Sequence, residues 1–165
     1  MKIFLDCEFT QLNQYSKLIS LALVSESAEE FYVELTDTYS VADCSDFVIQ
    51  TVLPQLDLLQ HGQSLIDAQA SLRRFLGCFD EKLEVCSDAP NRDWKFFCDL
   101  ICADHQPWPD QVLNEPTDLA ILFNKVEAEA LDQVELSDPP HHALLDARML
   151  AELFKILASR LVLSP

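Results

Sequence analysis

The feature that most constrains the fold of this sequence is a pair of acids at the end of an apolar stretch near the N-terminus. Ile3, Phe4 and Leu5 are predicted to form a buried strand, which continues into Asp6 and Glu8. Side chains alternate across a strand, so both acids point to one face, with their Cα atoms about 6.6 Å apart. Two carboxylates so close together repel each other and resist burial, and cations relieve both penalties. The pattern therefore predicts a divalent-metal site.

Composition limits the classes of protein that remain. The chain has 165 residues and an apolar fraction of 49%, which predicts a single domain over residues 1–165 with a substantial core. The net charge of −17 argues against broad, sequence-independent binding to duplexes, which depends on many basic contacts to phosphates. Any nucleic-acid contact is expected to be short and to run through metal ions. The alternative is simply an acidic protein.

The sequence pattern excludes or disfavours several other classes of protein. No apolar run reaches membrane-spanning length and the N-terminus lacks a signal-peptide pattern, so we expect no membrane span and a cytoplasmic protein. The six cysteines lack zinc-finger spacing and are expected to be reduced and mostly buried. Gly62 and Gly77 are the only glycines, so there is no Gly-rich phosphate loop, which excludes dinucleotide-binding and P-loop folds.

The first third of the chain has the pattern of an antiparallel meander. After the first strand, Leu18–Val24 is almost continuously apolar, as in a central strand covered on both faces. Phe31–Leu35 alternates as a third strand, and the short connections favour antiparallel pairing. Phe47–Leu59 is moderately helical, with Pro54 interrupting or kinking it.

Further along the chain, extended and helical patterns alternate. Ser64 and Asp67 resemble a capping box that opens an amphipathic helix. The other predicted elements are a strand over Leu83–Cys86, a helix from about Asp93, a strand over Leu119–Phe123, a helix over Asn124–Asp132 and a last helix over Ala143–Leu161. This alternation predicts an α/β sandwich. Residues 104–116 are predicted to form a loop, in which Trp108 is either a partner or substrate contact or part of ordinary packing.

Two further aspartates lie on the apolar faces of predicted helices. Asp93 precedes an inward stripe of aromatic and aliphatic residues, and Asp146 stands in the same relation to the stripe of the last helix. For each aspartate taken singly, a role at the N-terminal helix cap is the favoured explanation. Together with Asp6 and Glu8 they make an oxygen-rich set suited to Mg²⁺ or Mn²⁺. Two such ions, about 3.5–4 Å apart, can activate a water and stabilise the leaving oxygen of a phosphodiester.

A histidine stands at a suitable offset from this set. His141 lies five residues before Asp146, in the loop that enters the last helix. A loop histidine can reach an attacking water and accept its proton, because histidine titrates near neutral pH. The alternative is a surface residue that follows Pro139 and Pro140.

These motifs together resemble the DEDDh 3′–5′ exonucleases, over nearly the whole chain. Asp6-x-Glu8 resembles the first motif of that family, Asp93 the second, and His141 five residues before Asp146 the third. The resemblance is nearest to small bacterial exoribonucleases whose first strand reads Asp-x-Glu-Phe. It implies an RNase H-like fold, with a mixed five-stranded sheet and helices on both faces. It also implies stepwise hydrolysis of single-stranded or short RNA from the 3′ end to nucleoside 5′-monophosphates.

The resemblance also implies roles for individual residues. Asp6, Glu8, Asp93 and Asp146 would hold two Mg²⁺ or Mn²⁺ ions, and His141 would deprotonate the attacking water. Only His141, and not His142, has the five-residue spacing to the last aspartate. Phe9 would pack beside the terminal nucleotide, or else belong to the core. Residues 12–15 are weaker candidates for contact with the 3′ end.

Some alternatives stay open at this stage. In the second motif Arg92 stands where an aromatic residue is frequent, so Asp88 is an alternative ligand to Asp93. The substrate could be DNA, because discrimination rests on contacts to the 2′-hydroxyl. A catalytically inactive binding protein with this fold is a third possibility, and a homodimer is plausible because many proteins of the family are dimers.

Overall fold

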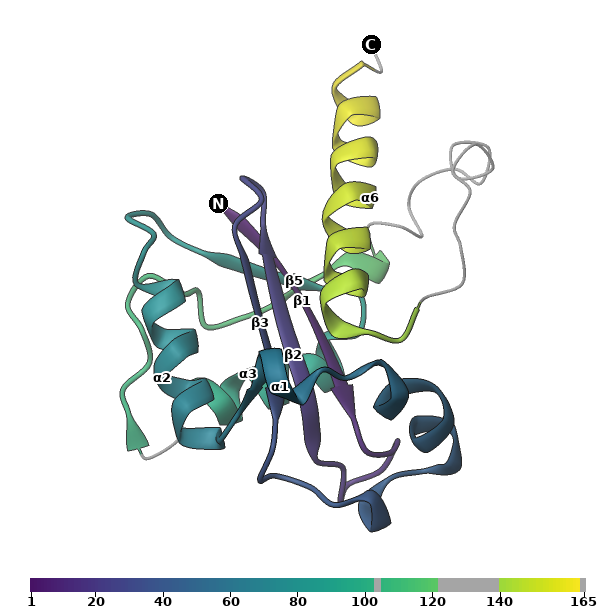
Figure 1. Ribbon diagram of the computed structural model, residues 1–165. Coiled ribbons are helices and arrows are strands. Elements are labelled where there is room, and N and C mark those ends of the chain that lie inside the picture. The colour runs from purple at the N-terminus through teal and green to yellow at the C-terminus, as the bar shows by residue number, and fades with distance from the viewer. Residues whose placement is uncertain (103–104, 122–139, 164–165) are drawn as a thin grey trace.

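A mixed β-sheet forms the centre of the protein, and helices cover both of its faces (Figure 1). The computed structural model describes residues 1–102, 105–121 and 140–163. The strands are β1 (Lys2–Phe9), β2 (Leu18–Ser25), β3 (Glu30–Leu35), β4 (Gly62–Gln63), β5 (Glu84–Ser87) and β6 (Thr117–Asp118), in the order β4-β3-β2-β1-β5-β6. The described α-helices are α1 (Leu58–His61), α2 (Leu65–Leu76), α3 (Pro90–Ile101) and α6 (Ala143–Leu163).

The predicted meander is confirmed. Strand β1 pairs antiparallel with β2, and β2 pairs antiparallel with β3. On its other side β1 pairs in parallel with β5, and this register places Phe4 beside Cys86. Every residue of β2 is buried, as its continuous apolar pattern requires of a central strand. The carboxyl ends of β1 and β5 therefore lie side by side at the same end of the sheet.

The two faces of β1 pack against different helices because its side chains alternate. Ile3, Leu5 and Cys7 belong to one core cluster with the apolar faces of α2 and α3. Phe4 belongs to a second cluster with the buried alanines and Leu150 of α6. Figure 1 shows α2 and α3 on one side of the sheet and α6, drawn in yellow, on the other. The fold is therefore α/β, with helices on both faces of the sheet, as predicted.

Within the described residues the sheet has six strands, and the prediction was five. The additional pairing comes from β4, a two-residue strand parallel to β3, at the edge opposite β6. The predicted strand over Leu119–Phe123 is wrong for residues 119–121, which are helical, and β6 lies just before them; residues 122 and 123 lie outside the described residues. Asp118 explains the change, because its Oδ1 accepts a hydrogen bond from the Ala120 N–H at 2.9 Å and caps this helical segment. The predicted helix over 124–132 lies outside the described residues.

The segment Phe47–Leu59 is not one kinked helix. A π-helical turn spans Val48–Val52, a 3₁₀ turn spans Leu53–Gln55, and α1 starts only at Leu58. Pro54 accounts for the break, because it has no N–H and its ring displaces the preceding turn. The apolar side of the segment is retained, since Val48 and Val52 pack on Ile19 of β2.

The structure also tests the predictions for Trp108 and for the cysteines. The Trp108 indole N–H donates a hydrogen bond to the Val112 carbonyl at 2.8 Å, and its ring contacts Trp94 and Phe97. The structure thus favours the packed-loop alternative for this residue. All six cysteines are free thiols, but Cys78 is exposed, so their predicted burial is only partly correct. Among the described residues, no helix has the length and apolar character needed to cross a membrane.

Candidate metal centre

Carboxylates gather where the ends of β1 and β5 meet. Asp6 and Glu8 alternate with Cys7, so they share the face of β1 that carries Phe4 and α6. Asp88 directly follows β5, two residues after Cys86, and the partner of Cys86 on β1 is Phe4, two residues before Asp6; oxygens of Asp6 and Asp88 lie within 4.8 Å of each other. The pairing of these two strands therefore brings three acids together at their carboxyl ends.

Two helices each add one aspartate from their first turn. Asp93 is 2% exposed, and its Oδ2 accepts a hydrogen bond from the Ser87 hydroxyl at 2.5 Å. Asp146 is 6% exposed, and its Oδ2 accepts from the backbone N–H of His142 at 2.9 Å. Helix α3 begins at Pro90, a residue that suits the first position of a helix, and so places Asp93 within that turn rather than at the cap. Each aspartate is thus oriented by one hydrogen bond.

The five carboxylates form two sets that share one member. In the first set, ligand oxygens of Asp6, Glu8 and Asp146 all lie within 4.8 Å of one another. In the second, oxygens of Asp6, Asp88 and Asp93 meet the same limit. Asp88 therefore lies together with Asp93 instead of replacing it. Two adjoining oxygen sites with a shared carboxylate suit a pair of divalent cations.

Unpartnered oxygens give a direct test of whether these residues fit cations. Asp6 Oδ2 and Asp146 Oδ1 are buried and accept no hydrogen bond among the described residues. A buried carboxylate oxygen without a partner is costly, and a cation compensates it fully. The donor set contains only carboxylate oxygens, the ligands that Mg²⁺ and Mn²⁺ prefer. The residues present therefore fit divalent cations.

The crowding of these acids changes their titration. Burial, reinforced by Asp93 and Glu8, raises the pKa of Asp6 well above its ordinary value. Burial, followed by Asp146 and Asp93, raises the pKa of Glu8 to about 8. Burial also raises the pKa of Asp93 to about 7, and it raises the pKa of Asp146, although a hydrogen bond opposes the rise in each case. Without cations the folded protein therefore retains protons that an unfolded chain releases.

This retention predicts a stability that falls with pH. Between the ordinary pKa of 4.5 and the raised pKa of about 8 for Glu8, the folded state binds more protons than the unfolded state. The free energy of unfolding of the metal-free protein must then decrease as pH rises through this window. We expect its melting temperature to fall by about 5 °C or more between about pH 5 and pH 8. Excess Mg²⁺ should flatten the profile, and a metal-free melting temperature that rises with pH would contradict the raised pKa values.

His141 lies at the mouth of the carboxylate cavity. It lines both this cavity of ≈ 240 Å³ and a neighbouring, mainly apolar pocket of ≈ 570 Å³. Its backbone has φ 52°, in the left-handed region, and Gln55 Nε2 donates hydrogen bonds to the carbonyls of Pro140 and His141 at 2.8 and 3.2 Å. Its ring and that of Phe47 are nearly perpendicular, with centroids 4.9 Å apart. The loop therefore holds the imidazole beside the carboxylates.

His142 has a different position. Its ring stacks on Tyr32 with centroids 5.0 Å apart, and its Nδ1 is buried. Its backbone N–H orients Asp146, as described above. The two adjacent histidines thus separate into one that lines the cavity and one that is part of the packing behind it.

Phe9 lies both in the core and at the site. Its ring stacks on Phe96 with centroids 5.4 Å apart, so the core interpretation holds. The same residue lines the carboxylate cavity and the apolar pocket, which it shares with Leu12 and Phe47. A break in the strand register between Glu8 and Phe9 occurs at this point, as is common beside functional sites.

Sequence reasoning missed some residues of this site. Ser87, which orients Asp93, received no role, although a polar residue at the end of a buried strand was a usable signal. Phe47 was assigned only to a helix, and nothing in the local pattern connects it with His141. Asp88 was weighed only as a substitute for Asp93.

Comparison with known proteins finds similarity to solved structures and none to family models or curated sequences. No protein-family model matches the sequence, and no curated protein matches it. Solved structures that share the fold include S. pombe Pop2p in a form with Mg²⁺ and Mn²⁺ bound. The two sequences are 16% identical, the match covers 96% of this chain and 83% of that chain, and the TM-score is 0.67. The RNase domain of the yeast Pop2 protein matches with 12% identity, 97% and 77% coverage, and a TM-score of 0.63.

The likeness covers almost the whole chain, so it concerns the complete sheet and its helices and not a fragment. At these identities it establishes architecture, and the nearer resemblance to small bacterial exoribonucleases stays a prediction. The protein therefore has the RNase H-like fold of the Pop2 structures, with five carboxylates gathered at the carboxyl ends of two parallel strands.

Proposed function

We propose that this protein is a metal-dependent 3′–5′ exonuclease that hydrolyses single-stranded or short nucleic acid, preferably RNA, to nucleoside 5′-monophosphates. The observation that carries the proposal is the pair of three-carboxylate sets that share Asp6. Further support comes from structures of the same fold, one with Mg²⁺ and Mn²⁺ bound and one described as an RNase domain. The proposal also agrees with the order and spacing of the sequence motifs.

The carboxylates would hold two cations, Mg²⁺ or Mn²⁺. One site would use Asp6, Glu8 and Asp146, and the other Asp6, Asp88 and Asp93. When bound, such cations supply activation of the attacking water and neutralisation of charge on the phosphate. Ser87 would contribute by keeping one oxygen of its aspartate partner fixed, which orients the other oxygen toward the cavity.

His141 would accept the proton of the attacking water. It is the described histidine that lines the carboxylate cavity, and its imidazole is held against Phe47. Fixing the proton acceptor before the substrate arrives reduces the entropy lost on reaching the reactive geometry. The hydrogen bonds from Gln55 to the loop carbonyls serve the same end.

The apolar pocket beside the cavity is suited to the terminal nucleoside. Its volume is ≈ 570 Å³, and its apolar wall includes Phe9, Leu12, Phe47 and Val48. A nucleobase offers an aromatic face that packs well on such side chains, whatever its sequence. Binding of the last nucleotide here would place the adjoining phosphodiester at the carboxylates, because Glu8, Phe9 and His141 line both spaces.

Matched RNA and DNA oligonucleotides test this function directly. With Mg²⁺ or Mn²⁺ we expect 5′-labelled single strands to shorten stepwise from the 3′ end, with release of nucleoside 5′-monophosphates and faster turnover of RNA. Chelation should stop the reaction, and a blocked 3′ end should protect the substrate. Faster turnover of DNA would overturn the RNA preference, internal cleavage would overturn the exonuclease assignment, and binding without hydrolysis would indicate an inactive binding protein.

A further inference from the structure

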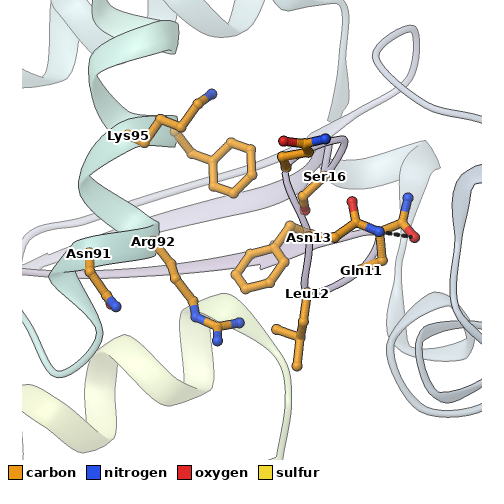
Figure 2. A pocket seen from close by; sticks show the side chains of 10 residues that line it. Gln11, Leu12, Asn13, Ser16, Asn91, Arg92 and Lys95 are labelled. Atoms are coloured by element: carbon orange, nitrogen blue, oxygen red, sulfur yellow. Dashed lines mark hydrogen bonds between the residues drawn. The ribbon is translucent and has the colours of Figure 1, made fainter.

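A second pocket adjoins the site and has a different chemistry. It has a volume of ≈ 230 Å³ and lies between α3 and the loop after β1. Figure 2 shows Arg92 and Lys95 extending from α3 on one side and Leu12, Asn13 and Ser16 from the loop on the other. We call this pocket the α3 groove. Its polar amide and hydroxyl groups and its two basic side chains contrast with the apolar pocket described above.

The basic side chains of the α3 groove are unusual in so acidic a chain. Several other cations of the described part are engaged: Lys17 pairs with Asp43 at 2.8 Å, and Arg148 pairs with Glu30 at 2.6 Å. Arg92 is exposed, and its side chain makes no ion pair or hydrogen bond with any described residue. The guanidinium acts on the neighbouring Asp93 only through electrostatics, so its N–H donors stay available to an anion from solution.

Lys95 lies one turn further along α3. Its ammonium pairs with Asp99 at 2.5 Å, but both side chains are more than 60% exposed, so exchanging this partner for a phosphate costs little. Its ammonium also lies 5.3 Å from the centroid of the Phe96 ring, another residue of the groove. The groove thus combines cations with an aromatic face, the usual combination for a single nucleic-acid strand.

The α3 groove is connected to the catalytic cavity. It shares Phe9, Gln11 and Leu12 with the apolar pocket, so these residues form a common wall between the two. Phe9 also lines the carboxylate cavity, and Arg92 directly precedes Asp93. Two binding spaces therefore flank the carboxylates, on either side of one wall.

Given the proposed exonuclease function, on which this step rests, we infer that the α3 groove binds the nucleotide on the 5′ side of the scissile phosphodiester. The terminal nucleotide leaves after each cut and suits the apolar pocket. The remaining strand continues away from the site and carries further phosphates, which need cations. Arg92 would hold the next phosphodiester, Lys95 would add a second charge, and the base would pack on the Phe96 side of the wall.

This assignment predicts that substrates need an upstream nucleotide for tight binding. A p-nitrophenyl ester of a nucleoside 5′-monophosphate fills the terminal position alone, whereas an oligonucleotide also fills the α3 groove. The KM for Arg92→Ala should therefore rise about 10-fold for the oligonucleotide, with kcat nearly unchanged, because one charge-assisted contact is lost. The KM for the ester should change far less, and Lys95→Ala should act in the same direction.

The salt dependence of KM gives a second measurement, which a purely structural effect of Arg92→Ala would not alter. Loss of one phosphate contact should reduce the slope of log KM against log salt by about 0.7 for a single strand. Arg74→Ala is the matched control, since Arg74 is exposed, lies on α2 and lines none of the three pockets. It removes the same charge and should leave both KM values and the slope unchanged.

The outcomes separate the two proposals. If the parent protein hydrolyses both substrates and Arg92→Ala raises KM only for the oligonucleotide, the α3 groove is the upstream site. If Arg92→Ala behaves like Arg74→Ala, or changes both substrates equally, the groove assignment is overturned while the exonuclease function stands. If the parent protein hydrolyses neither substrate, both proposals are overturned.

Discussion

Replacing Asp6 with asparagine is expected to abolish hydrolysis, with a loss of about a thousandfold or more in kcat. Asp6 is the carboxylate common to both three-member sets, so this single change removes a ligand from each proposed cation site. Asparagine has nearly the same shape, so the strand and its neighbours should be undisturbed. Turnover of an oligonucleotide with Mg²⁺, together with calorimetric titration of Mn²⁺, measures the effect.

The same substitution should stabilise the metal-free protein. Asp6 has a buried oxygen without a hydrogen-bond partner, and its pKa is raised by burial and by four neighbouring acids. Removing its charge relieves that repulsion, so the melting temperature near pH 8 should rise, while Mg²⁺ should no longer increase it. A functional site commonly has this opposition between activity and stability.

Asp80→Asn is the matched control for this experiment. Asp80 is exposed and belongs to neither carboxylate set, so its replacement removes the same charge at a position outside the proposed site. Both activity and melting temperature should stay at the parent values. An Asp6→Asn protein that kept its turnover, or that melted earlier without metal, would contradict the two-site interpretation.

The strands of the meander could be predicted because their evidence is local. Alternation in β1 and the continuous apolar run in β2 follow directly from which faces are buried. The inward positions of Asp93 and Asp146 were predictable for the same reason, since helical spacing places each on a buried stripe. Local periodicity thus located four of the carboxylates.

The fifth carboxylate depends on pairing between distant segments. Asp88 reaches the site because β5 pairs in parallel with β1, in a register that sets Phe4 beside Cys86. Nothing in the sequence near residue 88 specifies that register. Sequence reasoning therefore treated Asp88 and Asp93 as rivals, whereas the pairing of the strands lets both approach Asp6.

The short elements were unpredictable for a related reason. Strands β4 and β6 have two residues each, too few to show any period, and they exist only through their neighbours. Gly62 illustrates this dependence in part, since a Cβ there would lie 3.1 Å from Cγ2 of the distant Thr36, as well as 2.3 Å from the nearby Leu58 carbonyl oxygen. Both the preceding helix and the neighbouring segment therefore leave no room for a side chain at this position.

His141→Asn should reduce kcat by about 10²–10⁴-fold, the range typical of losing a general base. Asparagine tolerates the left-handed backbone that His141 adopts at φ 52°, so the loop should keep its shape while the proton acceptor is lost. Because the carboxylate sets contain no histidine, the affinity for Mn²⁺ should be retained.

His105→Asn is the control that this chain offers, since His105 is exposed, also has a left-handed backbone at φ 58°, and lines none of the three pockets around the carboxylates. It should leave kcat unchanged, so that a loss confined to His141→Asn reports the imidazole and not the backbone. Calorimetric titration decides between the remaining interpretations. Full Mn²⁺ affinity with slow turnover identifies His141 as the proton acceptor, whereas weakened Mn²⁺ binding would make it a structural support of the metal centre.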